Sequence, residues 1–138
     1  MKVYDATLRR VVDGDTVDVD INLGFNVRLD NQRIRIMGID APESRTSDAT
    51  EKVFGLAAKR KVQELLHGDL QLIVEEDKAE KFGRILGDFK VGDRRLTDIL
   101  VEDGYAVRYY GGDKHALEEQ HLANRTKLLE AGVVPRQT

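Results

Sequence analysis

Two short acidic segments hold the side chains best suited to bind a metal ion or to activate water. Asp13-Gly14-Asp15 falls where two predicted strands meet, and its glycine can take a positive φ angle that fixes the directions of the flanking carboxylates. Asp40-Ala41-Pro42-Glu43 falls where a predicted strand gives way to a loop, a common location for catalytic groups. Taken singly, each segment is also explained as an ordinary turn with exposed acids. An EF-hand is excluded, because its sixth position requires glycine and here, counted from Asp13, holds Asp18.

Two arginines add a second kind of chemistry. Arg35 lies shortly before Asp40, on the polar side of the predicted strand. A guanidinium can hold a phosphate through paired hydrogen bonds, while carboxylates beside it can bind a hard metal ion or act as a base. Arg84 ends the segment Lys81-Phe82-Gly83-Arg84, which by itself is typical of a charged hairpin loop. The combination indicates a site that handles a phosphate ester.

Length and composition limit the class of protein. The 138 residues are 41% hydrophobic, enough for the core of one domain, so we expect a single domain over residues 1–138. The lack of cysteine removes disulfides and thiolate sites and leaves oxygen or imidazole as metal ligands. A net charge of −3 argues against a protein that coats nucleic acid, although a local basic cleft is compatible with it.

The sequence contains no apolar run long enough to span a membrane, and charge begins at Lys2, too early for a signal-peptide apolar region. We therefore expect no membrane contact. An intracellular or viral setting is weakly favoured, and the location itself is left open.

Alternating apolar residues predict strands over residues 1–36. Apolar residues at 17, 19, 21 and 23 indicate one buried face, which puts Asp18 and Asp20 on a solvated face. Gly24 predicts a break, and a further strand is expected over residues 25–29. Asp30-Asn31 predicts another turn, followed by a strand that ends at Ile36.

The apolar period changes to that of a helix over residues 48–66, with Asp48 and Glu51 as a capping arrangement. Strands are predicted over residues 70–75 and 84–91. A short helix then begins near Leu96 and stops at Gly104, and a last helix with a thin apolar stripe covers residues 113–131. Five strands and three helices predict an α+β protein, mainly β, in which helices pack against a small closed barrel.

These segments together resemble the staphylococcal nuclease family in residue identity, order and spacing. Asp13-Gly14-Asp15-Thr16-Val17 resembles the family's first acidic motif, and residues 35–43 resemble its arginine-to-glutamate segment. Lys81-Phe82-Gly83-Arg84 resembles its second arginine motif, and the likeness extends over residues 11–129. The resemblance implies an OB-fold, a five-stranded barrel with three helices, and a nuclease site on one face of the barrel.

The resemblance also implies a metal site. Asp15 and Asp40 would bind calcium with the help of the backbone carbonyl of Ala41, and Asp13 would lie near the ion without binding it. Calcium accepts about six to eight oxygen ligands, so water and a phosphate oxygen could complete its coordination.

The catalytic roles follow from the same resemblance. Glu43 would position or deprotonate the attacking water, and Arg35 and Arg84 would hold the phosphate. The expected enzyme is a monomeric, calcium-dependent phosphodiesterase that hydrolyses DNA, with RNA left open as a second substrate, and leaves 3′-phosphates.

The substrate-binding part departs from the family pattern. Lys81, Phe82, Tyr109 and Tyr110 are the expected substrate contacts, but Phe82 replaces a tyrosine and lacks its hydroxyl. Gly111-Gly112 also removes one aromatic ring that the family has. Since each stacked base contributes about 1–3 kcal/mol, these changes should weaken binding more than chemistry.

Two other functions remain open at this point. The chain could be a catalytically silent OB-type module that binds nucleic acid or protein, or a structural domain stabilised by calcium. The complete set of acids and arginines favours the nuclease. The histidines do not form a ligand cluster in the sequence and are expected to lie outside the site, at the surface or at helix ends: His67, His115 and His121.

Overall fold

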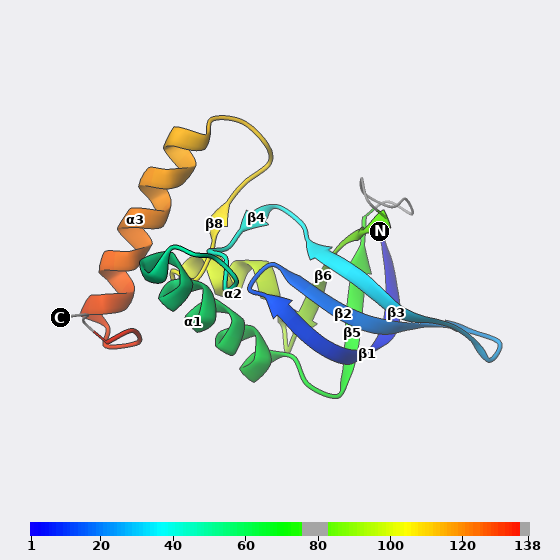
Figure 1. Ribbon diagram of the computed structural model, residues 1–138. Coiled ribbons are helices and arrows are strands. Elements are labelled where there is room, and N and C mark those ends of the chain that lie inside the picture. Colours follow the sequence, from blue (N-terminus) through cyan, green and yellow to red (C-terminus); the bar gives the residue numbers. More distant parts are fainter. Residues whose placement is uncertain (76–82, 136–138) are drawn as a thin grey trace.

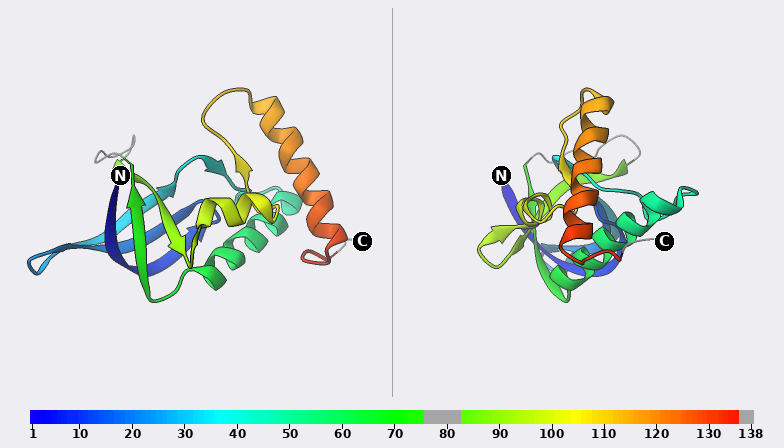
Figure 2. Two further views of the ribbon diagram at one scale, coloured as in Figure 1. Left: turned by 180° about the vertical axis from the view of Figure 1, so that it is seen from behind. Right: turned by 90° about the vertical axis from the view of Figure 1, so that its left-hand side faces the viewer.

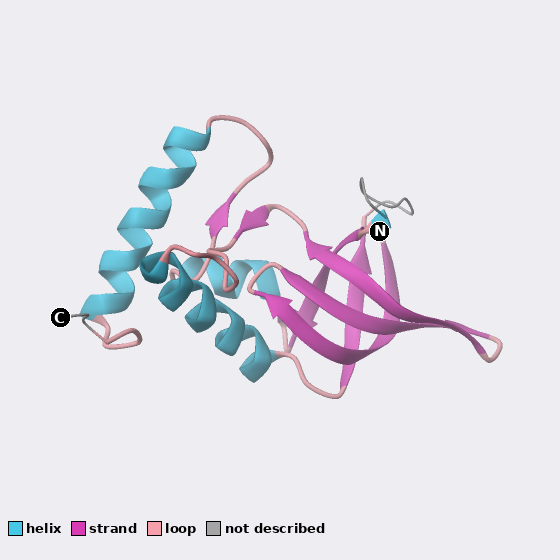
Figure 3. Ribbon diagram, viewed as in Figure 1, coloured by secondary structure: helices cyan, strands magenta, loops and turns pink. Residues whose placement is uncertain are grey.

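The computed structural model describes residues 1–75 and 83–135. Within them, five strands form a barrel and three helices gather at one of its ends (Figure 1, Figure 3). The α+β OB-type barrel expected from the sequence is therefore confirmed. The barrel strands are β1 (Lys2–Asp13), β2 (Thr16–Gly24), β3 (Val27–Ile36), β5 (Asp69–Val74) and β6 (Ile85–Val91). The short strands are β4 (Ile39–Asp40), which pairs with β8 (Val107–Arg108), and β7 (Arg94–Arg95), which pairs with β6.

The barrel closes along a parallel seam between β3 and β6. The other neighbours pair antiparallel in the order β3-β2-β1-β5-β6. At the seam, Arg35 lies beside Leu86 and Ile36 beside Gly87. Arg84 directly precedes β6, so it enters the sheet next to the strand that carries Arg35. The fold thus brings two arginines that are distant in sequence to adjacent strands.

Strands β2 and β3 continue past the barrel as a two-stranded ribbon, at the end opposite the helices (Figure 1, Figure 2). Its turn is formed by Phe25 and Asn26, whose φ angles are 54° and 62°. The expected turn at Asp30-Asn31 and separate strand over 25–29 were wrong, because residues 27–36 form one strand. Asn31, with a φ of 54°, sits at an irregularity of the pairing, where a bulge bends a strand without reversing it.

Strand β2 turns its predicted apolar face inward. Val17, Val19 and Ile21 are buried, as expected. Asp18, expected on a solvated face, is only 4% exposed. Arg10 and Arg33 from the two neighbouring strands cover it, with Nε to carboxylate distances of 2.8 and 2.9 Å. The interpretation as a solvated face was wrong for Asp18, because arginines on both sides neutralise and shield it.

The helices are α1 (Ala49–Leu65), α2 (Leu96–Glu102) and α3 (Lys114–Glu130). The predicted cap of α1 is confirmed for Asp48, whose side chain accepts hydrogen bonds from the N–H groups of Thr50 and Glu51. The N–H of Asp48 donates to the Thr46 hydroxyl instead of to the Glu51 side chain. The start of α2 is tied to β6, where buried Asp88 accepts a hydrogen bond from the Thr97 hydroxyl at 2.7 Å. No helix among the described residues is long and apolar enough to cross a membrane.

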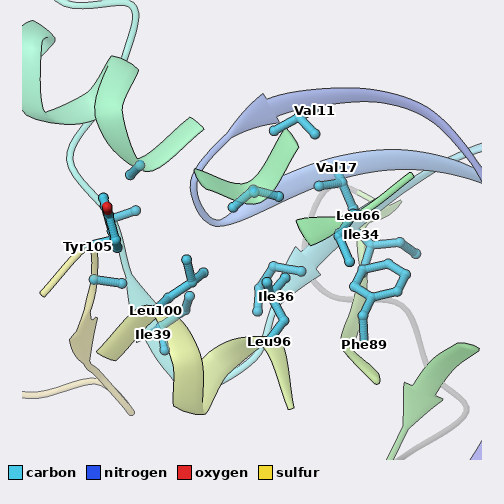
Figure 4. Close-up of a cluster of buried hydrophobic side chains, with 14 of the residues drawn as sticks. Val11, Val17, Ile34, Ile36, Ile39, Leu66, Phe89, Leu96, Leu100 and Tyr105 are labelled. Carbon is cyan, nitrogen blue, oxygen red and sulfur yellow. The ribbon is translucent and has the colours of Figure 1, made fainter. Parts of the chain in front are cut away.

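One continuous core joins the barrel to the helices. Figure 4 shows it running from Phe89 and Ile34 inside the barrel to Leu100 and Tyr105 near the helices. Helix α3 contributes least to this core, because Leu128 is buried while Leu122 is 50% exposed. The thin apolar stripe predicted for the last helix is therefore real, and α3 needs other contacts to hold its position.

Candidate active site

The turn between β1 and β2 is locked to the segment that follows β4. Asp15 Oδ2 accepts a hydrogen bond from the N–H of Ala41 at 3.0 Å, and Oδ1 accepts one from the Thr16 hydroxyl at 3.0 Å. The main-chain oxygen of Asp15 accepts a further bond from Ile36 N–H at 2.8 Å. Asp15 is thereby fixed to both β3 and the second acidic segment, so the two segments predicted from the sequence meet.

Gly14 is required at this turn for space rather than for a positive φ angle. It is absent from the glycines with positive φ, so the sequence-based reason for this glycine was wrong. A Cβ atom at Gly14 would lie 2.7 Å from the Cβ of Ala58 in α1 and 3.0 Å from the Cβ of Ala41. Gly55, in the same helix, lets the main chain of Glu43 pass where a Cβ atom would collide with its carbonyl group. Helix α1 therefore packs closely against both acidic segments.

Asp13 holds the far side of the second segment. Its Oδ1 accepts hydrogen bonds from the hydroxyl of Ser44 and from the Ser44 N–H, the latter at 3.1 Å. Ser44 is 3% exposed, so this contact lies under the surface. Asp13 thus anchors the residue after Glu43.

Arg35 lies between the two acidic segments. Its Nη1 group donates to the carbonyl oxygens of Asp15 and Ile36 at 3.3 and 3.0 Å, and Nη2 donates to that of Ile39 at 2.9 Å. These bonds hold the guanidinium 3.5 Å from Asp15 Oδ2 and 3.8 Å from Asp40 Oδ1. Since a guanidinium has five N–H donors, the described residues leave Nε and part of Nη2 for another acceptor.

Asp40 is held from two sides. Its Oδ1 faces Arg35, and its Oδ2 lies 2.8 Å from Nε2 of His121 in α3. The expectation that His121 lies outside the site was wrong. Its signal in the sequence was weak because a lone histidine on a helix has no partner nearby in the chain, and only the docking of α3 brings it to Asp40.

Burial sets the electrostatics of Asp15. The side chain is 13% exposed, and its loss of hydration raises the pKa of the carboxyl group above the usual range. Arg35 opposes this rise, as do the hydrogen bonds from Ala41 and Thr16, while the charge of Asp40 adds to it. Asp15 is therefore a buried acid whose charge Arg35 and the two hydrogen bonds only partly stabilise.

The donor chemistry fits a hard cation. The carboxylates of Asp15 and Asp40 both approach the guanidinium of Arg35, and each of their oxygens can accept a second interaction. The carbonyl of Ala41 belongs to the segment whose N–H is bonded to Asp15. Oxygen donors of this kind suit calcium, which takes carbonyl and water oxygens as readily as carboxylates. Among residues 1–75 and 83–135, no three His, Asp or Glu side chains surround a common point. Any cation held by Asp15 and Asp40 would therefore need other oxygens to complete its coordination.

The remaining predicted catalytic residues with a described position are Glu43, in the segment after β4, and Arg84, directly before β6. The Glu43 side chain is exposed, on a main chain fixed by Gly55 and Ser44. Arg84 is partly buried at the start of β6. Lys81 and Phe82 lie outside the described residues.

A hollow beside Arg35 is lined by the two predicted tyrosines. Tyr109 donates its N–H to the carbonyl of Gly38 at 3.0 Å, and the ring of Tyr110 covers Gly38 so closely that a Cβ there would lie 2.8 Å from it. Tyr110 is 81% exposed, and Arg108 also lines this hollow. A flat, exposed ring next to an arginine is a surface on which a base can stack.

Comparisons with known proteins show which sequences the chain resembles. A family model described as staphylococcal nuclease homologue matches residues 33–129. That span contains Arg35, Asp40, Glu43 and Arg84, whereas Asp15 lies before it and joins it through the hydrogen bond to Ala41.

Curated proteins also resemble the chain. Micrococcal nuclease of Shigella flexneri is 32% identical over 132 residues, which is 86% of this chain and 68% of that protein. SPbeta prophage-derived endonuclease YokF of Bacillus subtilis (strain 168) is 32% identical over 107 residues, 76% of this chain and 34% of that protein. Thermonuclease of Staphylococcus intermedius is 27% identical over 105 residues, 75% of this chain and 59% of that protein. The chain thus spans between about a third and two thirds of the length of these relatives.

Proposed function

Because the chain belongs to the staphylococcal nuclease family, we propose that it is a calcium-dependent nuclease that hydrolyses phosphodiester bonds of DNA, with RNA as a second substrate. The observation that carries the proposal is Arg35, held by three main-chain oxygens between Asp15 and Asp40 with donors still available. The guanidinium lines the hollow that also contains Tyr109 and Tyr110, so a phosphate bound there could reach it.

The metal part of the proposal rests on the donor set. Asp15, Asp40 and the carbonyl of Ala41 would hold the ion. When bound, calcium would act as a Lewis acid on the phosphate and bring a water molecule close to it. The burial of Asp15, whose side chain is 13% exposed, supports this assignment, because a nearby cation would offset the hydration that its carboxylate has lost.

The protein's own residues would supply the remaining steps. Arg35 can donate from Nε and Nη2 to the phosphate oxygens, and Arg84 from the adjacent strand can do the same. Both interactions should strengthen as charge builds on those oxygens in the transition state. The exposed carboxylate of Glu43 would accept a proton from the attacking water or orient it. Cleavage that leaves a 3′-phosphate would follow the usual outcome in the family.

Substrate binding would use the hollow beside Arg35. The rings of Tyr109 and Tyr110 would stack against bases, and Arg108 would meet the backbone. Since the whole chain carries a charge of −3, binding should depend strongly on salt and on the metal.

Cleavage of single- and double-stranded DNA with calcium, with magnesium and with a chelator tests the proposal. Arg35→Ala serves as the inactive variant, and Arg28→Ala is its matched control on the same strand, since Arg28 is exposed on the ribbon and bonded to Asp30. We expect calcium-dependent cutting by the parent and by Arg28→Ala, and none by Arg35→Ala.

The two alternatives give other results. A folded protein that binds oligonucleotides but never cuts them would be a silent binding module. A protein whose melting temperature rises with calcium and not with nucleotides would be a calcium-stabilised structural domain.

A further inference from the structure

We propose that His121 is a positioning residue for the active site, and that through it helix α3 fixes the direction of the Asp40 carboxylate. The inference rests on the proposed function, because it assigns a role towards an ion that Asp40 would bind. His121 Nε2 lies 2.8 Å from Asp40 Oδ2, and the two residues are far apart in the chain.

The bond assigns different tasks to the two oxygens of Asp40. A carboxylate only accepts, so His121 donates its Nε2–H to Oδ2. The other oxygen, Oδ1, is left on the side of Arg35 and Asp15. Asp40 is 33% exposed along its side chain, and without a donor at Oδ2 the more distant guanidinium of Arg35, 3.8 Å from Oδ1, would be its remaining charged partner. His121 therefore keeps Oδ1 directed towards the site.

The position of His121 along α3 makes it suited to this role. The helix is anchored through its second half, where Leu128 is buried, Asn124 donates to the carbonyl of Ala106 at 3.1 Å, and Arg125 lies over the ring of Phe54. His121 is 17% exposed, whereas most of the helix before it is exposed.

Figures 1 and 2 both show the first half of α3 extending beyond the helices α1 and α2. A helix fixed at one end can place a donor near that end with little motion. His121 occupies this place, one turn before the anchored residues.

His121→Leu tests the inference, with His121→Gln as the conservative variant and His115→Leu as the matched control. Leucine favours a helix more than histidine does, so the helix itself should persist. Glutamine keeps an N–H donor on a flexible side chain. His115 is exposed in the first turn of the same helix, so His115→Leu removes a histidine from α3 and leaves His121, which meets Asp40, in place.

The first readout is calcium affinity, measured by titration calorimetry on the purified full chain without substrate. Loss of a residue that orients a metal ligand typically weakens metal binding about 10- to 100-fold, and we expect a loss in that range for His121→Leu. His121→Gln should lie between His121→Leu and the parent, and His115→Leu should equal the parent. The second readout is cleavage against calcium concentration, where excess calcium should restore most of the rate of His121→Leu.

A purely structural role gives a different pattern. If His121 only stabilised the fold, the melting temperature of His121→Leu would be lower than that of the parent in the presence of chelator. Added calcium would then not restore the cleavage rate of the variant. Equal calcium affinity in His121→Leu and in a parent that cleaves DNA would overturn the positioning role and leave the proposed function intact. A parent that neither binds calcium nor cleaves would overturn the proposed function, and the positioning role with it.

Discussion

The Asp15 carboxylate accepts a hydrogen bond from the main-chain N–H of Ala41 at 3.0 Å, across 26 positions of the chain. With the bonds from Ser44 to Asp13, this contact joins the first acidic segment, at the turn between β1 and β2, to the second, which begins in β4. Gly14 makes the contact possible, because its missing side chain lets the turn sit against Ala41 and Ala58. The site therefore depends on close packing as much as on its charged groups.

Gly14→Ala should damage both folding and activity. The added Cβ would lie 2.7 Å from the Cβ of Ala58, and overpacking of this kind costs about 1–3 kcal/mol of unfolding free energy. Urea unfolding and cleavage rates measure the two effects. Gly14→Ala combined with Ala58→Gly reopens the space, so the double variant should be more stable than the sum of the single effects predicts. Strict additivity of the two changes would show that the contact does not limit the turn.

Glu43→Gln and Asp40→Asn should separate proton transfer from metal binding. General bases contribute on the order of 10²- to 10⁴-fold, so Glu43→Gln should lower turnover by that range with calcium affinity unchanged. Asp40→Asn removes a charged ligand and should weaken calcium binding itself. Calorimetry and steady-state cleavage distinguish the two. A Glu43→Gln enzyme that cut at the parent rate would remove Glu43 from the chemistry.

Arg84→Lys should lower the cleavage rate with little change in folding stability. Lysine keeps the charge and loses the planar pair of donors, and the loss of one transition-state donor costs on the order of 10²-fold in rate. Stopped-time cleavage assays at saturating calcium measure the effect, and thermal unfolding checks the fold. Unchanged kinetics would show that Arg84 does not contact the phosphate.

Asp18→Asn should destabilise the barrel in a pH-dependent way. Hydrogen bonds from Arg33 and then from Arg10 lower the pKa of Asp18 below its usual range, so the folded protein binds this proton less readily than the unfolded chain. Asp18 therefore stabilises the fold above its unfolded pKa of about 3.9, and this contribution is lost as the pH falls through the lower, folded pKa.

We expect Asp18→Asn to cost about 1–3 kcal/mol at neutral pH and much less in strong acid. Urea unfolding between neutral and acidic pH measures the difference. Asp30→Asn is the control, since Asp30 pairs with Arg28 on the exposed ribbon and should change stability little at any pH. An equal loss at all pH values would assign the role of Asp18 to packing rather than to charge.

Much of the architecture could be predicted from patterns that are local in the chain. The cap at Asp48, the buried alternation of Val17 and Val19, and the stop at Gly104 depend on neighbouring residues, and the structure agrees with each. The prediction of a turn at Asp30-Asn31 was wrong because asparagine and aspartate favour turns and bulges alike. Pairing with the neighbouring strand decides which of the two forms.

The contacts of the site could be predicted less well. Buried Asp18 depends on arginines from both neighbouring strands, and the bond between Asp40 and His121 depends on where α3 docks. The space around Gly14 depends on the approach of Ala58 from α1. Each of these contacts depends on how helices and strands are placed relative to one another. The pattern of residues within one segment does not predict that placement.

The parallel seam between β3 and β6 also gives the chain an order of assembly. The antiparallel strands β1, β2 and β3 can pair as soon as they leave the ribosome, because each follows the last through a short turn. The seam must wait until α1, β5 and β6 have been synthesised, and its closure orders a long stretch of chain. A nascent chain that ends before β6 would therefore carry Asp15, Asp40 and Arg35 without Arg84. The two arginines proposed to hold the phosphate, Arg35 and Arg84, would therefore come together only when the barrel closes, late in synthesis.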